Sequence, residues 1–212
     1  MRTTFVLVRH GETEWNRGGR IQGHTDSRLT ADGMTQAEAI GKHLASERFD
    51  HLLASDLGRA HHTAALIAPH VNLPIVTHQG LRERGFGIAE GKTYAEIERD
   101  HPEMFSRSRD TDPDYAAQGG ESRRQFHTRI TEALAALAAE HVGRHVLLVT
   151  HGGVLAAIFR WLNGLPIASP HHIEIPNAAY NRICLDDGGW QIEVWGSVAH
   201  LAACTDNPRN GS

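Results

Sequence analysis

The chain has 212 residues and a net charge of −4 with histidine counted as neutral. This length predicts one domain, and the slightly acidic balance excludes a strongly basic surface for nucleic acid. Hydrophobic residues make up 40% of the sequence and charged residues 22%, which is typical of a globular domain and excludes intrinsic disorder. The longest apolar stretches, 133–139 and 154–159, are much shorter than the roughly 18 residues of a membrane-spanning helix. No membrane partner is therefore expected.

Cysteine usage and the first residues indicate the compartment. Cys184 and Cys204 are the only cysteines, and their spacing fits neither a disulfide framework nor a thiolate zinc site. The apolar run at 5–8 is too short for a secretory signal. A reducing, cytoplasmic location is expected.

Strands and helices alternate along the predicted chain. Short β-branched and aromatic runs predict strands at 4–8, 51–54, 75–78 and 145–150, followed by a hairpin of 183–185 and 190–194. Apolar residues at helical spacing predict helices after Thr30 to Leu44, at 55–68, at 123–137 and at 152–162, and a short helix is expected to open at Thr93. This order predicts a three-layer α/β/α fold with a mostly parallel central sheet, an antiparallel edge hairpin and a small inserted flap.

Capping and proline signals set the expected helix ends. Ser55 is the expected N-cap of the second helix, and Pro69 is expected to stop that helix after residue 68. Two capping boxes, Thr93 with Glu96 and Ser122 with Gln125, predict the starts of the next two helices. Pro74 favours an edge position for the strand that follows it.

The middle of the chain is less regular. Residues 80–91 contain four glycines, and residues 102–120 combine turn-forming and charged residues without periodicity. We therefore expect one domain at 1–202 that carries a flap at about 84–120. The polar residues 203–212 are expected to form a frayed tail.

Two histidines stand where predicted strands end. His10 follows the first strand and His151 follows the strand at 145–150, and a glycine comes after each of them. Ligands of open α/β sheets bind beyond the carboxyl ends of the strands. If the two strands are neighbours in the sheet, the two imidazoles meet at that edge.

Residues 7–16, Leu-Val-Arg-His-Gly-Glu-Thr-Glu-Trp-Asn, closely resemble the opening signature of the histidine phosphatase superfamily. That superfamily includes cofactor-dependent phosphoglycerate mutases and many small phosphatases. Further blocks that agree with the family in order are 20–23, 26 with 29–30, 55–60 with 63–64, 81–83, 86–87 with 90–91, 120–122 and 149–153. The resemblance runs from about residue 5 to residue 194, which is nearly the whole chain.

The resemblance implies phosphoryl transfer through a phosphohistidine on His10, whose other ring nitrogen needs a fixed acceptor such as a backbone carbonyl. It implies that Arg9 and Arg59 hold the non-bridging oxygens and that His151 adds a third contact. Glu83 is implied as the proton donor to the leaving oxygen and then as the base for water. The remaining implied substrate-binding residues are Asn16, Gln22, Gly23 and Gly152, the last at a helix start.

Hydrolysis and isomerisation both fit this chemistry. Only the 67 residues 84–150 separate Glu83 from His151, which is compact beside the mutase pattern and favours a phosphatase acting on small phosphomonoesters. A phosphoglycerate mutase remains the alternative, and only a mutase would need 2,3-bisphosphoglycerate as a cofactor. The alternative stays open because this segment has four arginines that could bind an acidic substrate: Arg107, Arg109, Arg123 and Arg124. No metal site is encoded, and no other cofactor is expected. A small phosphorylated metabolite is the expected partner of a monomer or homodimer.

Overall fold

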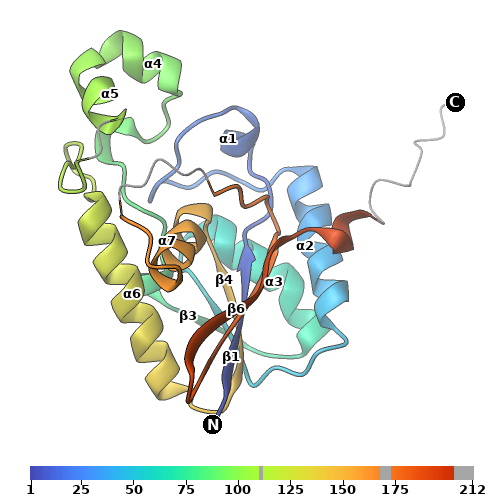
Figure 1. The fold of residues 1–212 in the computed structure, drawn as a ribbon. Helices are drawn as coiled ribbons and strands as arrows, with labels where there is room; N and C mark the ends of the chain where they lie inside the picture. Colours follow the sequence, from blue (N-terminus) through green and yellow to red (C-terminus); the bar gives the residue numbers. More distant parts are fainter. Residues whose placement is uncertain (110–111, 168–172, 203–212) are drawn as a thin grey trace, which may run out of the picture.

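The computed structural model describes residues 1–109, 112–167 and 173–202, so the expected tail at 203–212 lies outside the described residues. In this part of the chain one six-stranded sheet has the order β3-β2-β4-β1-β5-β6 (Figure 1). Its strands are β1 (Thr3–Arg9), β2 (His51–Ala54), β3 (Ile75–Thr77), β4 (His145–Thr150), β5 (Tyr180–Asp186) and β6 (Gly189–Ser197).

The pairing of the strands confirms the predicted α/β class. The pairs β1–β4, β4–β2 and β2–β3 are parallel, whereas β5 is antiparallel to both β1 and β6. The predicted edge position of the strand after Pro74 is also confirmed, because β3 is the outermost strand. In the β1–β4 ladder Arg9 is opposite Thr150, so His10 and His151 leave the sheet side by side.

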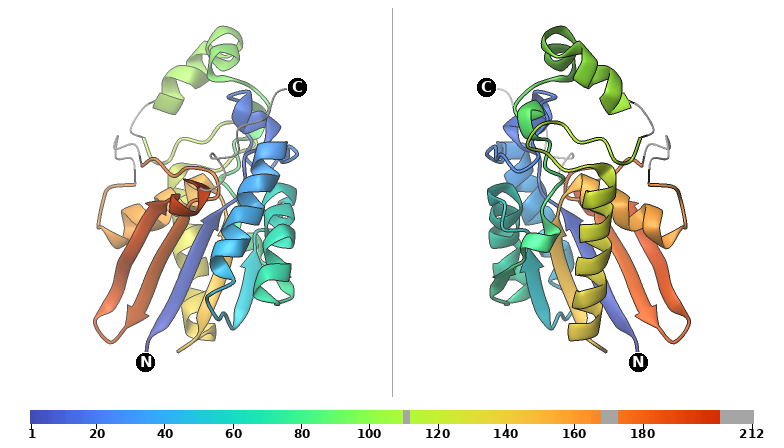
Figure 2. Two further views of the ribbon diagram at one scale, coloured as in Figure 1. Left: turned by 90° about the vertical axis from the view of Figure 1, so that its right-hand side faces the viewer. Right: turned by 90° about the vertical axis from the view of Figure 1, so that its left-hand side faces the viewer.

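Helices cover both faces of the sheet. The helices are α1 (Glu14–Arg17), α2 (Ala31–Leu44), α3 (Gly58–Val71), α4 (Tyr94–Asp100), α5 (Pro102–Arg109), α6 (Arg123–Glu140) and α7 (Gly152–Leu162), and the short 3-10 turns are η1 (Gln79–Leu81), η2 (Gly87–Ala89) and η3 (Ala199–Leu201). Figures 1 and 2 show α2 and α3 on one face and α6 and α7 on the other. None of the described helices is long and apolar enough to cross a membrane.

Strand β1 divides its side chains between two apolar cores. Phe5 and Leu7 belong to the core that contains residues of α6 and α7, whereas Val6 and Val8 belong to the core of α2 and α3. Successive side chains of a strand point to opposite faces, so a fully buried strand reads as a continuous apolar run. All four side chains are 0% exposed, and the strand ends are therefore held in a rigid frame.

Both predicted ends of α3 are wrong. The helix begins at Gly58. The carboxylate of Asp26 accepts hydrogen bonds from the backbone N–H groups of Gly58 (2.6 Å) and Arg59 (3.3 Å). A side chain distant in the sequence therefore caps the helix in place of Ser55. The helix also passes through Pro69 and ends at Val71, and its C-cap Asn72 has a left-handed backbone (φ 54°). A proline in the last turn removes a single donor, so the helix tolerates it.

The flap contains a helix that the sequence did not predict. The capping box of Thr93 and Glu96 begins α4 as predicted, but α5 occupies the segment for which no periodic structure was expected. Pro102 is the first residue of α5. The N–H group that proline lacks would have no hydrogen-bond partner within the helix at this position, so the proline costs the helix nothing. Because α5 packs on α4 and is largely solvated, it shows no long apolar stripe. Figure 2 shows both helices standing beyond the carboxyl edge of the sheet.

Candidate active site

His10 and His151 meet at the carboxyl edge of the sheet, as predicted for neighbouring strands. Their ring centroids are 5.3 Å apart and the rings are inclined at 62°. His10 is 3% exposed and His151 is fully buried. Two imidazoles that share a buried site, with two arginines nearby, form a centre suited to an anion.

The tautomer of His10 follows from its backbone contact. Its Nδ1 lies 2.8 Å from the carbonyl oxygen of Gly11, and since a carbonyl can only accept, Nδ1 carries the proton and Nε2 carries the lone pair. A Cβ at Gly11 would lie 2.3 Å from the carbonyl oxygen of Gly33, so only glycine allows this close approach. Burial, followed by the charges of Arg59 and Arg9, holds the pKa of His10 well below its usual value. The imidazole is therefore neutral at neutral pH.

Arg59 is a buried cation held by backbone carbonyls. Its guanidinium donates to the carbonyl of Gly23 (2.7 Å), to the carbonyl of Thr25 (3.2 Å) and to the carboxylate of Asp26 (2.9 Å). Its Nε is buried and has no hydrogen-bond partner among the described residues. Gly23 has a φ of 59°, and a Cβ there would meet the carboxylate of Glu90 at 2.1 Å. Gly23 therefore acts through its backbone.

Arg9 is the last residue of β1, and its side chain lies beside the start of α7. Its Nη1 donates to the carbonyl of Ile175 at 2.5 Å, and its Nε is buried without a partner in the described part of the chain. A Cβ at Gly152 would lie 3.2 Å from this Nε, so the glycine lets the helix start close to the guanidinium. Burial lowers the pKa of Arg9, while the charge of Glu83 raises it.

Ser55 is a functional candidate that the sequence reasoning missed. Its Oγ lies 2.8 Å from Nε2 of His151, and both side chains are fully buried. Nδ1 of His151 has no partner within the described residues, and burial together with Arg59 holds the pKa of this histidine well below its usual value. Ser55 follows β2 as His10 follows β1, and that strand-end position is the signal that could have identified it.

The Glu83 carboxylate lies at the N-terminus of α7. It accepts the backbone N–H of Arg84 at Oε1 (2.8 Å) and that of Gly153 at Oε2 (2.9 Å). The resemblance implies that the start of α7 at Gly152 binds the phosphoryl group, but the neighbouring N–H of Gly153 is bonded to Glu83. The charge of Glu83 raises the pKa of both Arg9 and Arg59, which places the carboxylate beside the two cations.

Arg129, on α6, fixes the loop that carries Glu83. Its guanidinium donates to the carbonyls of Gly80 (3.1 Å), Arg82 (3.0 Å) and Glu83 (3.1 Å), and also to both carboxylate oxygens of Glu121 (2.8 and 2.7 Å). No local motif marks this role, because Arg129 is 46 residues from Glu83 in the sequence. Arg129 therefore ties α6 to the loop that carries Glu83.

Asn16 and Gln22 differ in their contacts. Asn16 Oδ1 accepts the N–H of Thr13 at 3.1 Å in the capping box of α1, so the side chain stabilises this turn. The same oxygen accepts a hydrogen bond from the side-chain amide of Asn177 at 3.3 Å. Asn177 in turn donates to the carbonyl of His10 at 3.0 Å. Gln22 is 8% exposed, and its Oε1 is buried without a partner among the described residues.

Several side chains across the described residues have a buried polar atom without a partner, and four of these atoms belong to residues predicted for this site. The four are Nε of Arg9, Nε of Arg59, Oε1 of Gln22 and Nδ1 of His151. Such atoms are rare in folded proteins because each carries a desolvation penalty, so a cluster of them indicates a place for a polar ligand. Two guanidiniums among them favour an oxyanion. Within the described residues no group of three or more His, Cys, Asp or Glu side chains could hold a metal ion.

Comparisons with known proteins find a matching family model and similar chains. A family model, described as histidine phosphatase superfamily (branch 1), matches residues 5–198. Phosphoglycerate mutase-like protein 4 of Arabidopsis thaliana is 39% identical over 203 residues, which are 93% of this chain and 86% of that protein. Metal-independent phosphoserine phosphatase of the same plant is 39% identical over 204 residues, which are 95% of this chain and 84% of that protein.

Solved structures are similar over nearly the full length. YhfR of Bacillus stearothermophilus superimposes with a TM-score of 0.87 at 34% identity, covering 94% of this chain and 99% of that one. A mycobacterial glucosyl-3-phosphoglycerate phosphatase in complex with VO3 has a TM-score of 0.81 at 32% identity, covering 92% and 99% of the two chains.

Proposed function

Since the chain belongs to the histidine phosphatase superfamily, branch 1, we propose that it hydrolyses small phosphomonoesters through a phosphohistidine on His10. One observation carries the proposal. His10 is a buried, neutral imidazole with its proton held on Nδ1 by the Gly11 carbonyl, and it lies beside two guanidiniums whose Nε atoms lack partners in the described residues. This arrangement combines a nucleophile with a cradle for an oxyanion.

The first step transfers the phosphoryl group to the enzyme. The lone pair of His10 Nε2 forms a bond to phosphorus as the ester P–O bond breaks in line with it. Glu83, which carries a proton at this stage, gives that proton to the leaving oxygen, so that a neutral alcohol departs. Arg9 and Arg59 hold the non-bridging oxygens and balance their charge.

The second step returns the enzyme to its starting state. Glu83, now a carboxylate, takes a proton from a water molecule whose oxygen attacks the phosphorus. The N–P bond breaks and its electron pair returns to His10 Nε2, so inorganic phosphate and a neutral imidazole result. The carboxyl group is protonated again and can serve the next cycle.

His151 supplies a third contact to the phosphoryl group. A neutral imidazole whose Nε2 accepts the hydroxyl proton of Ser55 carries its own proton on Nδ1, which is the atom without a partner among the described residues. Gln22 and Asn16 are proposed as neutral contacts from the neighbouring loop. Gly23 and Gly152 contribute through backbone space next to Arg59 and Arg9.

We propose hydrolysis and not isomerisation because the segment between Glu83 and His151 is short. Its described residues form a flap of two short helices, α4 and α5, before α6 begins. Relatives of both kinds exist, and their names include a phosphoserine phosphatase described as metal-independent and a phosphoglycerate mutase-like protein. We accordingly propose that catalysis needs no metal and that the substrate is a small phosphorylated metabolite of the cytoplasm.

The test is release of inorganic phosphate from a panel of sugar phosphates, phosphoglycerates, nucleotides and phosphopeptides, with and without EDTA. Release from at least one class, unchanged by EDTA, is expected. A parallel assay follows interconversion of phosphoglycerates with and without 2,3-bisphosphoglycerate. No release from any ester overturns the proposal, and interconversion much faster than hydrolysis replaces it with the mutase.

A further inference from the structure

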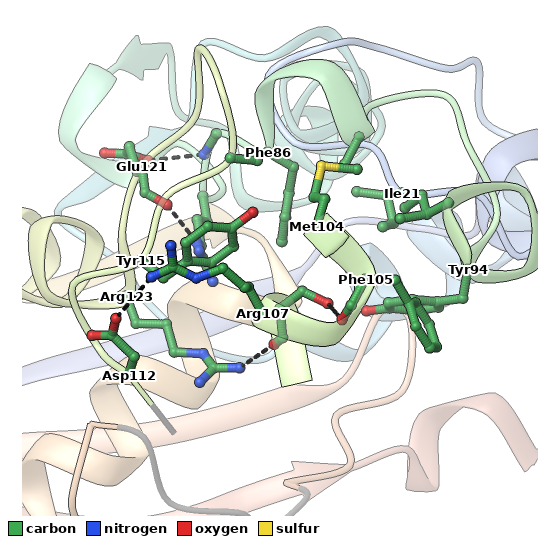
Figure 3. A pocket seen from close by; sticks show the side chains of 16 residues that line it. Ile21, Phe86, Tyr94, Met104, Phe105, Arg107, Asp112, Tyr115, Glu121 and Arg123 are labelled. Atoms are coloured by element: carbon green, nitrogen blue, oxygen red, sulfur yellow. Dashed lines mark hydrogen bonds and ion pairs between the residues drawn. The ribbon is translucent and has the colours of Figure 1, made fainter. Parts of the chain in front are cut away.

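Glu90 lies where two loops from distant parts of the sequence come together. The first loop, residues 20–26, follows α1, and the second, residues 82–90, contains Glu83 as well as Glu90. Ile21 of the first loop and Phe86 of the second line the same cavity of about 510 Å³ beneath the flap, as Figure 3 shows. The two loops therefore lie side by side next to the active site.

The carboxylate of Glu90 accepts four hydrogen bonds across this junction. Its Oε1 accepts the backbone N–H groups of His24 (3.0 Å) and Phe86 (2.9 Å). Its Oε2 accepts the backbone N–H (2.8 Å) and the hydroxyl of Thr25. Burial raises the pKa of Glu90, but these hydrogen bonds outweigh burial and lower the pKa below its usual value. Glu90 is therefore a fixed anion and not a proton donor.

The first loop depends on hydrogen bonds for its position. His24, Thr25 and Asp26 are exposed, so apolar packing does not hold them in place. Asp26 ties one end of this segment to α3, and Glu90 ties the other end to the second loop. Gly23 is buried directly against the Glu90 carboxylate, at a distance that leaves no room for a Cβ.

The backbone groups that Glu90 fixes are linked to those that hold Arg59. The peptide group between Gly23 and His24 donates its N–H to Glu90, and its carbonyl accepts Arg59 Nη2 at 2.7 Å. An N–H bonded to a carboxylate polarises its peptide group, which strengthens the carbonyl as an acceptor for a cation. Thr25 likewise donates its N–H to Glu90 and accepts Arg59 Nη1 at its carbonyl. Burial lowers the pKa of Arg59, and the charge of Glu90 is among those that raise it.

We propose that Glu90 is a positioning residue for the phosphoryl site, which orients Arg59 by fixing the backbone at residues 23–25. The inference rests on the proposed function, in which Arg59 holds the non-bridging oxygens. Because the loop binds Nη1 and Nη2 of Arg59, the position of the loop decides where the buried Nε–H points. Without Glu90, the loop and the guanidinium move together, and the oxyanion loses part of its cradle.

Binding of inorganic phosphate, measured by calorimetry, tests the proposal without turnover. In Glu90→Gln one carboxylate oxygen is replaced by an NH2 group, which cannot accept, so two of the four hydrogen bonds are lost. We expect the Kd for phosphate to rise at least about tenfold, equivalent to ~1.4 kcal/mol.

Glu96→Gln is the matched control. The carboxylate of Glu96 also binds a backbone N–H of the flap, that of Thr93, and also reaches the first loop, at Arg20. It makes these contacts away from residues 23–25, so the Kd for phosphate should change less than about twofold. A change of less than about twofold in Glu90→Gln, or an equal rise in the two variants, would overturn the inference.

A double-mutant cycle tests whether Glu90 acts through Arg59. Glu90→Gln is expected to lower kcat/KM for p-nitrophenyl phosphate about tenfold in the wild type and less than about twofold in Arg59→Met, where the guanidinium is absent. Arg59→Lys replaces Arg59→Met if that variant has no measurable turnover. The same factor in both backgrounds would mean that Glu90 acts on the site by another route, and the inference would be wrong.

A second variant covers the case in which Glu90→Gln does not fold, as judged by its circular dichroism spectrum. Thr25→Val removes only the hydroxyl bond to Glu90 and should raise the Kd for phosphate about threefold. An unchanged Kd in a folded Thr25→Val protein would then overturn the inference.

The two proposals fail in different ways. If the wild-type protein binds phosphate but releases none from any ester, the proposed hydrolysis is wrong and the phosphate titrations alone decide the role of Glu90. If hydrolysis proceeds and Glu90→Gln behaves like Glu96→Gln, the phosphatase stands and the role of Glu90 is wrong. If the wild-type protein neither binds phosphate nor hydrolyses an ester, both are wrong.

Discussion

At the carboxyl edge of the sheet, His10, Arg59 and His151 are 3%, 2% and 0% exposed, and backbone carbonyls or a buried hydroxyl hold them. In the flap, Ile97 is the one buried residue of α4. The first region permits little movement, because its side chains are enclosed by two apolar cores. The second is supported by fewer buried contacts and tolerates substitution. We therefore expect substitutions at the rigid edge to change phosphate release more than substitutions in the flap.

Removing the nucleophile tests the rigid region most severely. His10→Ala should lower phosphate release by about four or more orders of magnitude, because no other group can form the phosphohistidine. Phosphate release and the circular dichroism spectrum are measured on the same preparation. A substantial residual rate with an unchanged spectrum would contradict the assignment of His10.

Removing the proton donor should have the next largest effect. Glu83→Gln is expected to lower kcat for alkyl phosphates by about 10²–10⁴-fold, since an amide neither donates to the leaving oxygen nor activates water. With p-nitrophenyl phosphate, whose leaving group needs less protonation, a burst of one p-nitrophenol per enzyme should precede slow turnover. Glu140→Gln removes an exposed carboxylate at the end of α6 and serves as the control. Equal rates for the two variants would exclude Glu83 from the chemistry.

Substitution of Arg129 tests whether the contact between α6 and the Glu83 loop sets the position of the Glu83 carboxyl group. Arg129→Met should lower kcat about tenfold and leave KM nearly unchanged, because the substrate-binding groups are retained while the carboxyl loses its support. The same substitution at Arg124, which lies on the same helix and pairs with the exposed Asp114 of the preceding loop, should change neither constant. Similar losses in both variants would mean that a general effect on α6, and not the position of Glu83, is responsible.

The buried histidines also predict a pH dependence of stability. His10 and His151 have lowered pKa values in the folded state, chiefly from burial, so below the ordinary value of about 6.5 the unfolded chain binds more protons. The free energy of unfolding should therefore fall with decreasing pH, by about 1 kcal/mol for this pair between pH 7 and pH 6.

Denaturant titrations of the wild type and of His10→Asn measure this effect. His200, whose pKa burial lowers to about 4, acts in the same direction, so the variant is needed to isolate one site. The variant should show a shallower dependence across pH 7 to 6. An identical dependence in the two proteins would show that His10 is not held neutral by the fold.

Local signals predicted the elements around the site well. The capping boxes of Thr93 with Glu96 and Ser122 with Gln125 are both present, and the predicted strand at 51–54 has the observed bounds. These signals succeed because they act between neighbours in the chain. The predicted end of α3 is wrong because Pro69 does not stop the helix. The packing of α3, which buries Ile67, carries the helix past the proline.

The sequence by itself determined the family, the alternation of strands and helices, and the positions of His10 and His151 at strand ends. Only the tertiary structure decided that Ser55, 96 residues from His151, bonds its imidazole, that Asp26 caps α3, and that a cavity forms under the flap. The physical reason is one of range. Backbone preferences and caps act over a few residues, whereas hydrogen bonds between distant side chains depend on which strands become neighbours in the sheet.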